Sequence, residues 1–510
     1  MCGCHLRHGL AAPRTETGRL AARVMATVSA LLVCAGTTCA QPPDTLWART
    51  FGGTNIDVAY DARQATDGGF IATGYTRSQG SGGHDVWLLK TDPDGHEEWD
   101  RAFGGGDDDE GQAVCQTGDG GYVAAGFTES SGAGGKDVWL VKADASGDEL
   151  WTRVFGGAHD EEAYAVQETV DGGLIVAGAT SSYGAGGRDV WLIKTDDSGM
   201  PIWTRTLGGF GSDGAWSVSL TADSGFVLAG WTFSSGPGFL GNAWLVKTDS
   251  LGTIEWDRTF GGADADRGYA VRQTTDGGYV MAGYTGSSGA GLYDLYLVKT
   301  DDQGTLEWSQ AFGGSGRDYG RGVVQTADGG YLAAGYTLSY GAGGDDVWLV
   351  RTAADGTFRW QTTYGGSASD VGYSLAHTTD GGFLVAGHTL SFGAGLHDAW
   401  LIRLAPEGTS AIAGRTVAPP VMALGVQPNP FSRSATIGFA VPGASRATLR
   451  IHDASGRMVR LFEQPCCEAG MRSVVWDGLG QGGERVAPGV YFCRLESGGV
   501  QTVVKIVRVE

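Results

Sequence analysis

An acidic side chain recurs in seven similar segments of this chain, each time six residues after the aromatic residue or leucine that precedes a Gly-Gly pair. The seven residues are Asp57, Asp109, Glu161, Asp213, Asp266, Asp318 and Asp370. Seven carboxylates around one opening could hold a cation or bind a basic or hydroxyl-rich ligand. We favour a structural role, in which each carboxylate accepts hydrogen bonds from the amides of its own Gly-Gly loop. Repetition in every segment is typical of scaffolding, whereas a catalytic site needs asymmetry.

A second acidic position lies two residues before a tryptophan or tyrosine in every segment. Its members are Asp85, Asp137, Asp189, Asn242, Asp294, Asp346 and Asp398. Because Asn242 fills this position in one segment, we expect hydrogen bonding to matter there more than ionisation. The hairpins that contain Asp92 and Asp196 lack the alternating acids and closing glutamate of a calcium loop, so we predict β-turns. The sequence predicts no metal site and no cofactor.

Signatures of catalysis are missing from the sequence as patterns. Histidines are scattered, and there is no GxSxG, HExxH or phosphate-binding loop. We therefore predict no catalytic residues. The fourth segment diverges most, with a one-residue insertion and additional aromatic residues that could stack on a sugar. A loop repacked around the insertion is the alternative interpretation. The candidate ligand-binding residues are Trp216, Trp231, Phe233 and Phe239.

All these residues belong to a repeat of 52 residues. The aspartate of a DGG or DSG turn recurs at that spacing, with one step of 53 between Asp223 and Asp276. Each repeat alternates apolar and polar residues in four short runs separated by glycine-rich turns, which is the pattern of four β-strands. Four-stranded repeats of this size are typical of propeller blades. We predict an all-β, seven-bladed propeller over residues 41–404.

The phase of the repeat indicates how the blades join. The last repeat ends without a fourth strand, whereas an additional strand precedes the first repeat at residues 46–53. We expect that strand to complete the last blade, because a closed ring leaves no exposed sheet edge. A glycine also recurs inside one strand of each repeat, for example Gly283. Since glycine weakens a strand, we predict that it makes room for a large side chain of the next blade.

Residues 1–40 have the features of an export signal. A basic region from Arg7 to Arg23 precedes a short apolar run, and small residues lie just before Gln41. No later apolar run is long enough to span a membrane as a helix. The net charge of −21 argues against a nucleic-acid partner.

Export permits disulfide bonds in the mature chain. Cys115 has no equivalent in the other repeats and is expected to be a lone thiol. Cys493 could pair with Cys466 or Cys467, a choice that the sequence leaves open.

The consensus of the repeat, W.RTFGG..D..AYAV..T.DGGY..AGYT.SSGAGG.DVWLVKTD..G, resembles the seven-bladed propeller repeat of secreted bacterial surface proteins. The resemblance covers residues 44–404, and it implies fold and export but no activity. The segment TD..G...W is also similar to the tryptophan-docking motif of quinoprotein propellers. The turn is one residue shorter here and quinoprotein enzymes have eight units, so we attribute the shared feature to blade packing and expect no quinone.

Residues 421–510 resemble a second family. The segments PNPFSRSATIGFAVP, LRIHDASGRMVR and APGVYFCRL, with VKIVRV after them, are similar to FlgD-like immunoglobulin-type modules of exported bacterial proteins. Sorting domains of the type IX secretion system share this order of motifs. The resemblance implies a β-sandwich of six or seven short strands that serves secretion or surface attachment. Residues 405–420, rich in Pro, Gly, Ala and Thr, are predicted to link the two domains.

Together these features predict an exported, non-catalytic propeller that presents a binding surface to a carbohydrate or a surface protein. Its C-terminal domain is expected to engage secretion machinery, and the protein to be secreted or held at the cell surface. A secreted polysaccharide lyase or hydrolase on a propeller scaffold is the alternative. Asymmetry distinguishes the two, since an enzyme needs a few divergent polar residues on one face.

Overall fold

A computed structural model describes residues 42–407, 424–427, 431–441, 445–467, 470–497 and 500–509. The predicted signal peptide at 1–40 and most of the predicted linker at 405–420 lie outside these residues. All regular elements in the described residues are β-strands, which confirms the all-β prediction. The described residues contain no helix long and apolar enough to cross a bilayer.

Seven antiparallel sheets of four strands occupy the described residues up to Leu404, which confirms the four-stranded repeat. The first sheet contains β2 (Asp57–Gln64), β3 (Phe70–Thr76), β4 (Asp85–Thr91) and β5 (Glu97–Phe103). The second sheet contains β6 (Asp109–Gln116), β7 (Tyr122–Thr128), β8 (Asp137–Ala143) and β9 (Glu149–Phe155). The third contains β10 (Glu161–Glu168), β11 (Leu174–Thr180), β12 (Asp189–Thr195) and β13 (Pro201–Leu207). The fourth sheet contains β14 (Asp213–Leu220), β15 (Phe226–Thr232), β16 (Asn242–Thr248) and β17 (Ile254–Phe260). The fifth contains β18 (Asp266–Gln273), β19 (Tyr279–Thr285), β20 (Asp294–Thr300) and β21 (Leu306–Phe312). The sixth contains β22 (Asp318–Gln325), β23 (Tyr331–Thr337), β24 (Asp346–Thr352) and β25 (Phe358–Tyr364).

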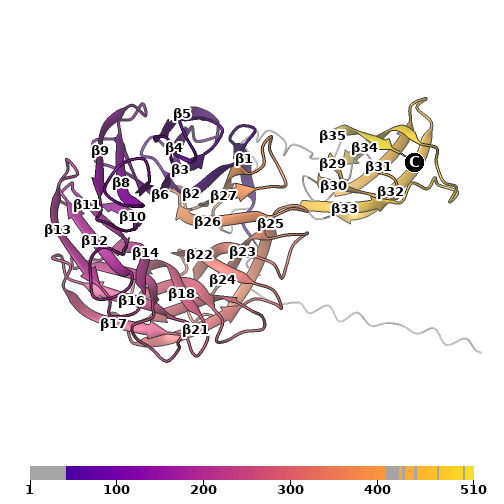
Figure 1. Cartoon of the computed structure of the whole chain (residues 1–510). Helices are drawn as coiled ribbons and strands as arrows, with labels where there is room; N and C mark the ends of the chain where they lie inside the picture. Colours follow the sequence, from indigo (N-terminus) through magenta and orange to yellow (C-terminus); the bar gives the residue numbers. More distant parts are fainter. Residues whose placement is uncertain are drawn as a thin grey trace, which may run out of the picture. The chain divides into compact units, whose positions relative to one another are not determined.

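The seventh sheet combines strands from both ends of this part of the chain. It contains β26 (Asp370–His377), β27 (Phe383–Thr389) and β28 (Asp398–Leu404), followed by β1 (Thr45–Phe51) as its outer strand. β1 lies antiparallel to β28, with Thr50 opposite Trp400. Residues 46–53, expected to supply a fourth strand to the last repeat, overlap β1. In Figure 1 the first strand of each sheet lies toward the centre of the seven sheets and the fourth strand toward the outside.

The hydrophobic core lies between neighbouring sheets. One cluster of buried side chains includes Val227, Leu245 and Phe260 of the fourth sheet with Met281 and Val298 of the fifth. The cluster between the first and seventh sheets includes Phe51, Phe70, Leu384 and Leu401. The third strands, such as β4 and β12, are buried along their whole length because both of their faces contact another sheet.

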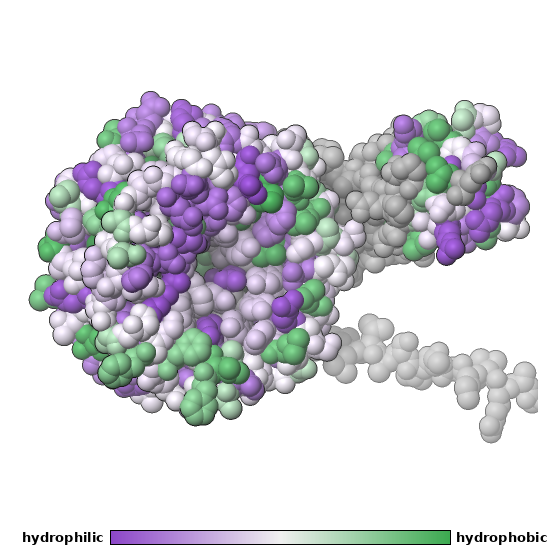
Figure 2. Space-filling model, viewed as in Figure 1, coloured by the Kyte–Doolittle hydropathy of each residue, from purple (hydrophilic) through white to green (hydrophobic). Residues whose placement is uncertain are grey.

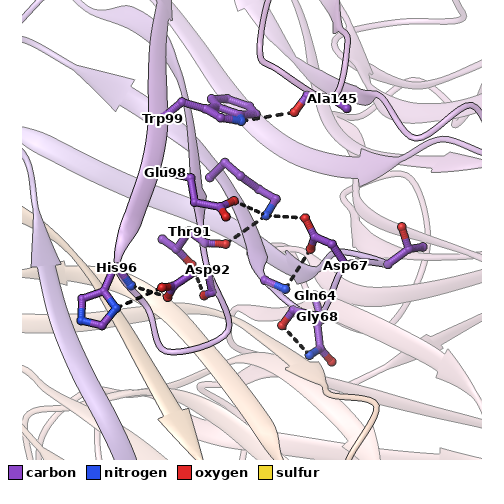
Figure 3. A network of polar contacts seen from close by, with 12 residues as sticks. Gln64, Asp67, Gly68, Thr91, Asp92, His96, Glu98, Trp99 and Ala145 are labelled. Carbon is purple, nitrogen blue, oxygen red and sulfur yellow. Dashed lines mark hydrogen bonds and ion pairs between the residues drawn. The ribbon is translucent and has the colours of Figure 1, made fainter.

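In six of the seven sheets, a tryptophan of the outer strand packs on a hairpin of the next sheet. Trp99 of β5, in the first sheet, donates from Nε1 to the carbonyl oxygen of Ala145, in the second sheet, at 3.2 Å (Figure 3). The hairpin ends in a glycine with positive φ, and a Cβ on Gly147 would lie 2.7 Å from the Trp99 ring. In the same way a Cβ on Gly95, in the first sheet, would lie 2.9 Å from the ring of Trp47 in β1. The TD..G...W motif therefore acts in sheet packing, as expected.

A buried cation in the third strand ties the DGG turn to the same sheet. The Lys90 side chain is 2% exposed and its Nζ lies 2.8 Å from both Asp67 Oδ2 and Glu98 Oε2 (Figure 3). It also donates to the Thr91 carbonyl oxygen at 3.0 Å. Equivalent pairs with DGG or DSG aspartates are formed by Lys142, Lys194, Lys247, Lys299, Arg351 and Arg403. From the sequence these aspartates were expected only in turns, and their ion pairs with a buried cation were not predicted.

The recurring strand glycine has a different reason from the one predicted. The pairing of β18 with β19 shifts between Gly268 and Ala270, so Tyr269 forms a β-bulge. A Cβ on Gly283 would lie 1.7 Å from the carbonyl oxygen of Arg267 in the adjacent strand. The prediction that a large side chain of the next blade fills this space is wrong. The obstacle is backbone of the same sheet, because the bulge brings the two strands close together.

The C-terminal part forms two sheets that share a core. One contains β29 (Leu424–Gln427), β30 (Ala435–Val441) and β33 (Gly470–Trp476), and the other β31 (Ser445–Asp453), β32 (Met458–Cys467), β34 (Gly489–Ser497) and β35 (Val500–Arg508). Ile437, Trp476, Ile451 and Leu495 are buried together between them. Cys493 is a buried free thiol and Cys115 a half-buried one. The predicted bond from Cys493 to Cys466 or Cys467 is therefore not formed in this structure, and the side chains of Cys466 and Cys467 lie outside the described part.

Candidate functional site

The bulged residue of the first strand is tyrosine in four sheets and a different residue in each of the other three, although the surrounding frame repeats. We call these seven residues the bulge ring. They are Tyr60, Gln112, Tyr164, Trp216, Tyr269, Arg321 and Tyr373. All seven are half-buried. A bulge changes the direction of one side chain relative to its strand, and here it does so at the same place in every sheet.

Members of the bulge ring contact one another between neighbouring sheets. The rings of Trp216 and Tyr269 are 4.3 Å apart between centroids, and those of Tyr60 and Tyr373 are 5.1 Å apart. The Arg321 guanidinium lies 3.8 Å from the centre of the Tyr269 ring. Figure 2 shows a hollow at the centre of the seven sheets, with hydrophilic residues on its margin. The bulge ring therefore gathers side chains of seven different strands around one centre.

One side of this centre is charged, and we call its residues the charged half. They are His84, Glu110, Lys136, Glu162 and Arg188. His84 Nδ1 lies 2.7 Å from Glu110 Oε1, and Lys136 Nζ lies 2.9 Å from Glu162 Oε1. Arg188 forms an ion pair with Glu162. Each glutamate follows the acidic residue that begins its strand, so the two occupy equivalent positions on neighbouring sheets.

The two glutamates of the charged half are held in opposite electrostatic states. Burial raises the pKa of Glu110, although His84 and Lys136 oppose this. Burial also acts against ionisation of Glu162, but the Arg188 charge and hydrogen bonds from Tyr164, Arg188 and Lys136 lower its pKa to about 2. Glu162 is therefore a carboxylate at any pH near neutrality, whereas Glu110 takes up a proton more readily than a solvated glutamate.

The opposite side is aromatic, and we call its residues the aromatic half. They are Trp216, Trp231, Tyr269, Tyr284, Tyr319 and Tyr336. The rings of Tyr284 and Tyr319 are 5.1 Å apart, and those of Tyr319 and Tyr336 stack at 4.8 Å. Burial raises the pKa of Tyr319 to about 12, so its phenol is neutral near neutral pH. The aromatic half offers ring faces and neutral hydroxyls in place of charges.

The structure brings together two of the four ligand-binding residues predicted from the fourth segment. Trp216 and Trp231 lie 4.1 Å apart between ring centroids, and a Cβ on Gly214 would lie 2.0 Å from Trp231. Phe233 is 42% exposed, and the Arg267 guanidinium lies 4.9 Å from its ring centre. Phe239 is 98% exposed in the loop that follows. Ligand binding by these residues stays a prediction.

The first acidic position is fully buried in all seven sheets. Asp57 Oδ2 accepts hydrogen bonds from the Gly53 amide at 2.8 Å and from the Ser78 hydroxyl at 2.6 Å. The second glycine of each Gly-Gly pair donates its amide in the same way to Asp109, Glu161, Asp213, Asp266, Asp318 and Asp370. These are the contacts that the structural interpretation requires, and whether the ring also serves a ligand stays a prediction.

The second acidic position adjoins the first from the neighbouring sheet. A Cβ on Gly365 would lie 1.9 Å from Asp346 Oδ1 and 2.8 Å from Asp370 Oδ2. Burial raises the pKa of Asp346 to about 6, and the nearby Asp370 and Asp345 add to this. Asn242 donates to the Ser235 carbonyl oxygen at 3.1 Å. In the described residues no three His, Cys, Asp or Glu side chains are grouped so that they could hold a metal ion.

Replacing Asp266 with asparagine is expected to lower the free energy of unfolding by about 1 kcal/mol, the contribution of a charge-assisted hydrogen bond. Asp266 Oδ2 accepts from the Gly262 amide at 2.9 Å and from Ser287 Oγ at 2.8 Å. Urea unfolding measures the change, and calcium titration of the unmutated protein is the companion experiment. Stoichiometric calcium binding that disappears in Asp266→Asn would make the ring a cation site.

The seventh repeat contributes a pair of histidines, His388 and His397. His388 and His397 stack at 4.7 Å, and His388 also contacts Tyr373 at 5.6 Å between ring centroids. Burial lowers the pKa of His388 to about 3 from its ordinary 6.5, and the neighbouring His397 adds to this. His388 is therefore neutral in the folded protein at pH values where it is charged in the unfolded chain.

This difference predicts acid sensitivity. Between pH 6.5 and pH 3 the unfolded chain binds a proton at His388 that the folded protein does not, so stability falls as pH falls. From pH 7 to pH 4, unmutated protein should lose about 3 kcal/mol more than His388→Phe. Phe127 fills the equivalent position, so the fold accepts this side chain. Urea unfolding at pH 7, 5.5 and 4 measures the difference, and parallel pH profiles would contradict the assignment.

Sequence reasoning found two members of the aromatic half, Trp216 and Trp231, but missed the charged half and the bulge ring as a whole. Apart from the fourth segment it singled out positions that repeat, whereas the bulge position varies between repeats. Alignment of the seven repeats would have shown one column that holds five aromatic residues, a glutamine and an arginine. That variability lies in a column flanked by repeated residues. It differs from the few divergent polar residues expected above of an enzyme, because most residues of the column are aromatic.

Comparisons with known proteins give one domain-level match and several distant ones. Residues 431–499 match the FlgD Ig-like domain. A stretch of 146 residues is 32% identical to the regulatory protein FlaEY of Caulobacter vibrioides, covering 26% of this chain and 15% of that protein.

Two solved structures with a similar course of the chain are a secretion-system component and a protease domain. PorZ, a bacterial surface component of the type IX secretion system of Porphyromonas gingivalis, is 14% identical with a TM-score of 0.42, covering 90% of this chain and 60% of that chain. The propeller domain of the trilobed protease from Pyrococcus furiosus is 11% identical with a TM-score of 0.36. The match covers 71% of this chain and 100% of that chain.

Proposed function

We propose that this chain, with its C-terminal FlgD Ig-like domain, is an exported, non-catalytic binding protein. Its seven sheets close into a propeller, the bulge ring and its two halves bind a carbohydrate or a surface protein, and the C-terminal domain serves secretion or surface attachment. Residues 1–40 direct export and residues 405–420 link the two domains. The asymmetry of the bulge ring within a repeated frame carries this proposal, because scaffolding alone has no need to replace the recurring tyrosine by glutamine, tryptophan and arginine in single sheets.

Contacts between the first and seventh sheets support closure. The Asp57 amide donates to the His397 carbonyl oxygen at 2.8 Å. Ser374 Oγ donates to Asp61 Oδ1 at 2.6 Å, and the Thr379 amide donates to Gln64 Oε1 at 2.7 Å. Together with β1 in the seventh sheet, these bonds join the two ends of the repeat array.

Binding is tested with the full mature chain, beginning at Gln41, on a glycan array and a panel of bacterial surface proteins. Trp216→Ala is expected to weaken binding by about tenfold or more, since a half-buried indole supplies much of the apolar contact area. Phe358→Ala is the matched control, because Phe358 is an exposed aromatic residue of the outer strand β25. No ligand on either panel, or equal binding by Trp216→Ala, would contradict the function.

A polysaccharide-active enzyme is a second candidate that one observation favours. Glu110 and Glu162 are equivalent residues of neighbouring sheets with opposite pKa shifts. Two carboxyls whose pKa values are shifted in opposite directions by their surroundings are also a feature of glycosidases. Release of reducing or unsaturated sugar ends is measured with bacterial polysaccharides, and we expect none. Activity that is lost in both Glu110→Gln and Glu162→Gln would replace the binding function by an enzymatic one.

The secretion role is tested separately, in a bacterium that has a type IX secretion system. A chain without residues 421–510 is expected to remain inside the cell envelope, whereas the full chain reaches the surface or the medium. Antibody labelling of intact cells and immunoblots of the medium distinguish these locations. Equal surface display of both chains would show that the C-terminal domain has another role.

A further inference from the structure

We propose that the ligand of the bulge ring is an acidic carbohydrate whose carboxylate is bound by Arg321 while a sugar ring stacks on the aromatic half. The inference rests on the proposed function, and it specifies the ligand class. It depends on the surroundings of one guanidinium group and on how the other cations around the same centre are paired.

Arg321 is enclosed by aromatic rings and not by acids. Its guanidinium carbon lies 3.8 Å from the centre of the Tyr269 ring and 5.8 Å from that of Tyr373. Nη2 donates to the Tyr336 hydroxyl at 3.3 Å, and the enclosed Nε has no hydrogen-bond partner. Among the described residues no carboxylate oxygen lies within ion-pair distance of it. Apart from the Tyr336 hydroxyl, its Nη groups have no acceptor among the described residues. These groups, and not the enclosed Nε, are the donors left for an acceptor from outside the chain.

Other cations around the centre already have partners. Lys136 and Arg188 both pair with Glu162. Arg267 donates to the carbonyl oxygens of Asp266 and Leu240 at 2.8 and 3.0 Å. Unlike Lys136 and Arg188, Arg321 has no carboxylate partner among the described residues, and an enclosed cation without an anion is costly to maintain. An anionic group supplied by a ligand would remove that cost.

The shape of the donor group favours a carboxylate. Guanidinium is planar, and two parallel N–H groups match the two oxygens of a carboxylate. The adjacent ring faces of Tyr269 and Trp216 favour a ligand with an apolar face, which the C–H groups of a pyranose provide. Its hydroxyls would find acceptors and donors in Gln112 and the charged half. A pyranose that carries a carboxylate, as in uronic acids, combines these features in one molecule.

The experiment uses the full mature chain and pairs of probes that differ only in the carboxyl group. Oligogalacturonate, oligoalginate and hyaluronan oligosaccharides are each compared with their carboxyl-reduced, neutral counterparts by calorimetry and by tryptophan fluorescence. At least one acidic probe is expected to bind, with its neutral counterpart about 10- to 100-fold weaker. Arg321→Gln should abolish that preference, and Arg321→Lys should retain part of it.

Two variants keep the test interpretable. Glutamine occupies the same position in the second sheet as Gln112, so Arg321→Gln is expected to fold, and melting curves check this. Arg258→Gln is the matched control, because Arg258 lies over the ring of Trp256 on an outer strand, and it should bind as the unmutated protein does.

The outcomes separate the two proposals. Equal binding of acidic and neutral probes, or a preference that survives in Arg321→Gln, would overturn the acidic ligand while leaving a carbohydrate-binding function intact. Tighter binding of a sulfated glycan or of a polyglutamate peptide would also overturn it. Absence of binding by every probe would overturn it as well, and the array and surface-protein panel would then decide whether the binding function itself fails.

Discussion

A chain that begins at Gly53 is expected to be markedly less stable than one that begins at Asp44. The shorter chain lacks β1, and the seventh sheet loses the ladder between β1 and β28. Burial of Phe51 and docking of Trp47 contribute roughly 1.5–3 kcal/mol each, and ladder hydrogen bonds add about 0.5–1.5 kcal/mol each. The entropy of ordering a seven-residue strand offsets part of this sum.

Thermal and urea unfolding followed by circular dichroism measure this difference. A chain that begins at Gln41 is the control, and it should match the chain that begins at Asp44, because residues 42–44 precede β1. Equal melting of the chains that begin at Asp44 and Gly53 would show that the seventh sheet needs no fourth strand. That result would also remove the main support for a closed propeller.

Gly283→Ala is expected to destabilise the protein by about 3 kcal/mol or more, the upper part of the range for overpacking. The added Cβ would lie 1.7 Å from the Arg267 carbonyl oxygen, so backbone and not a flexible side chain has to move. The bulge at Tyr269 should be lost or displaced with it. Urea unfolding gives the stability change, and fluorescence of the nearby Trp216 reports displacement of Tyr269.

Gly106→Ala provides the comparison for this substitution. A Cβ at Gly106 would meet nothing within 4 Å, so its effect should stay within about 0.5 kcal/mol. Gly335→Ala should behave like Gly283→Ala, because its Cβ would lie 1.8 Å from the Tyr319 carbonyl oxygen. If Gly283→Ala unfolds as the unmutated protein does, the strand glycine has no part in forming the bulge.

The repeated parts of the structure were accessible from the sequence. Strand periodicity, turn residues and the hydrogen-bonding position of Asp57 are set by residues close together in the chain, and seven copies of each pattern reinforce one another. The strand that precedes the first repeat could be placed beside the last one by counting strands. The same counting could not reveal the ion pair of Lys90 with Asp67, since a lysine in a strand usually reads as solvent-facing.

The sequence by itself determined the all-β repeat, its four strands and the presence of an asymmetric fourth segment. Only the tertiary structure decided that the space beside Gly283 is filled by backbone of its own sheet. It also decided that the bulge beside Gly283 turns Tyr269 toward the centre. It further decided which residues meet there, such as Asp61 and Ser374, which are 313 positions apart. The physical reason is that strand formation follows from local periodicity, whereas the bulge ring arises from small changes of direction in seven strands, and these act together only after the sheets have packed around one centre.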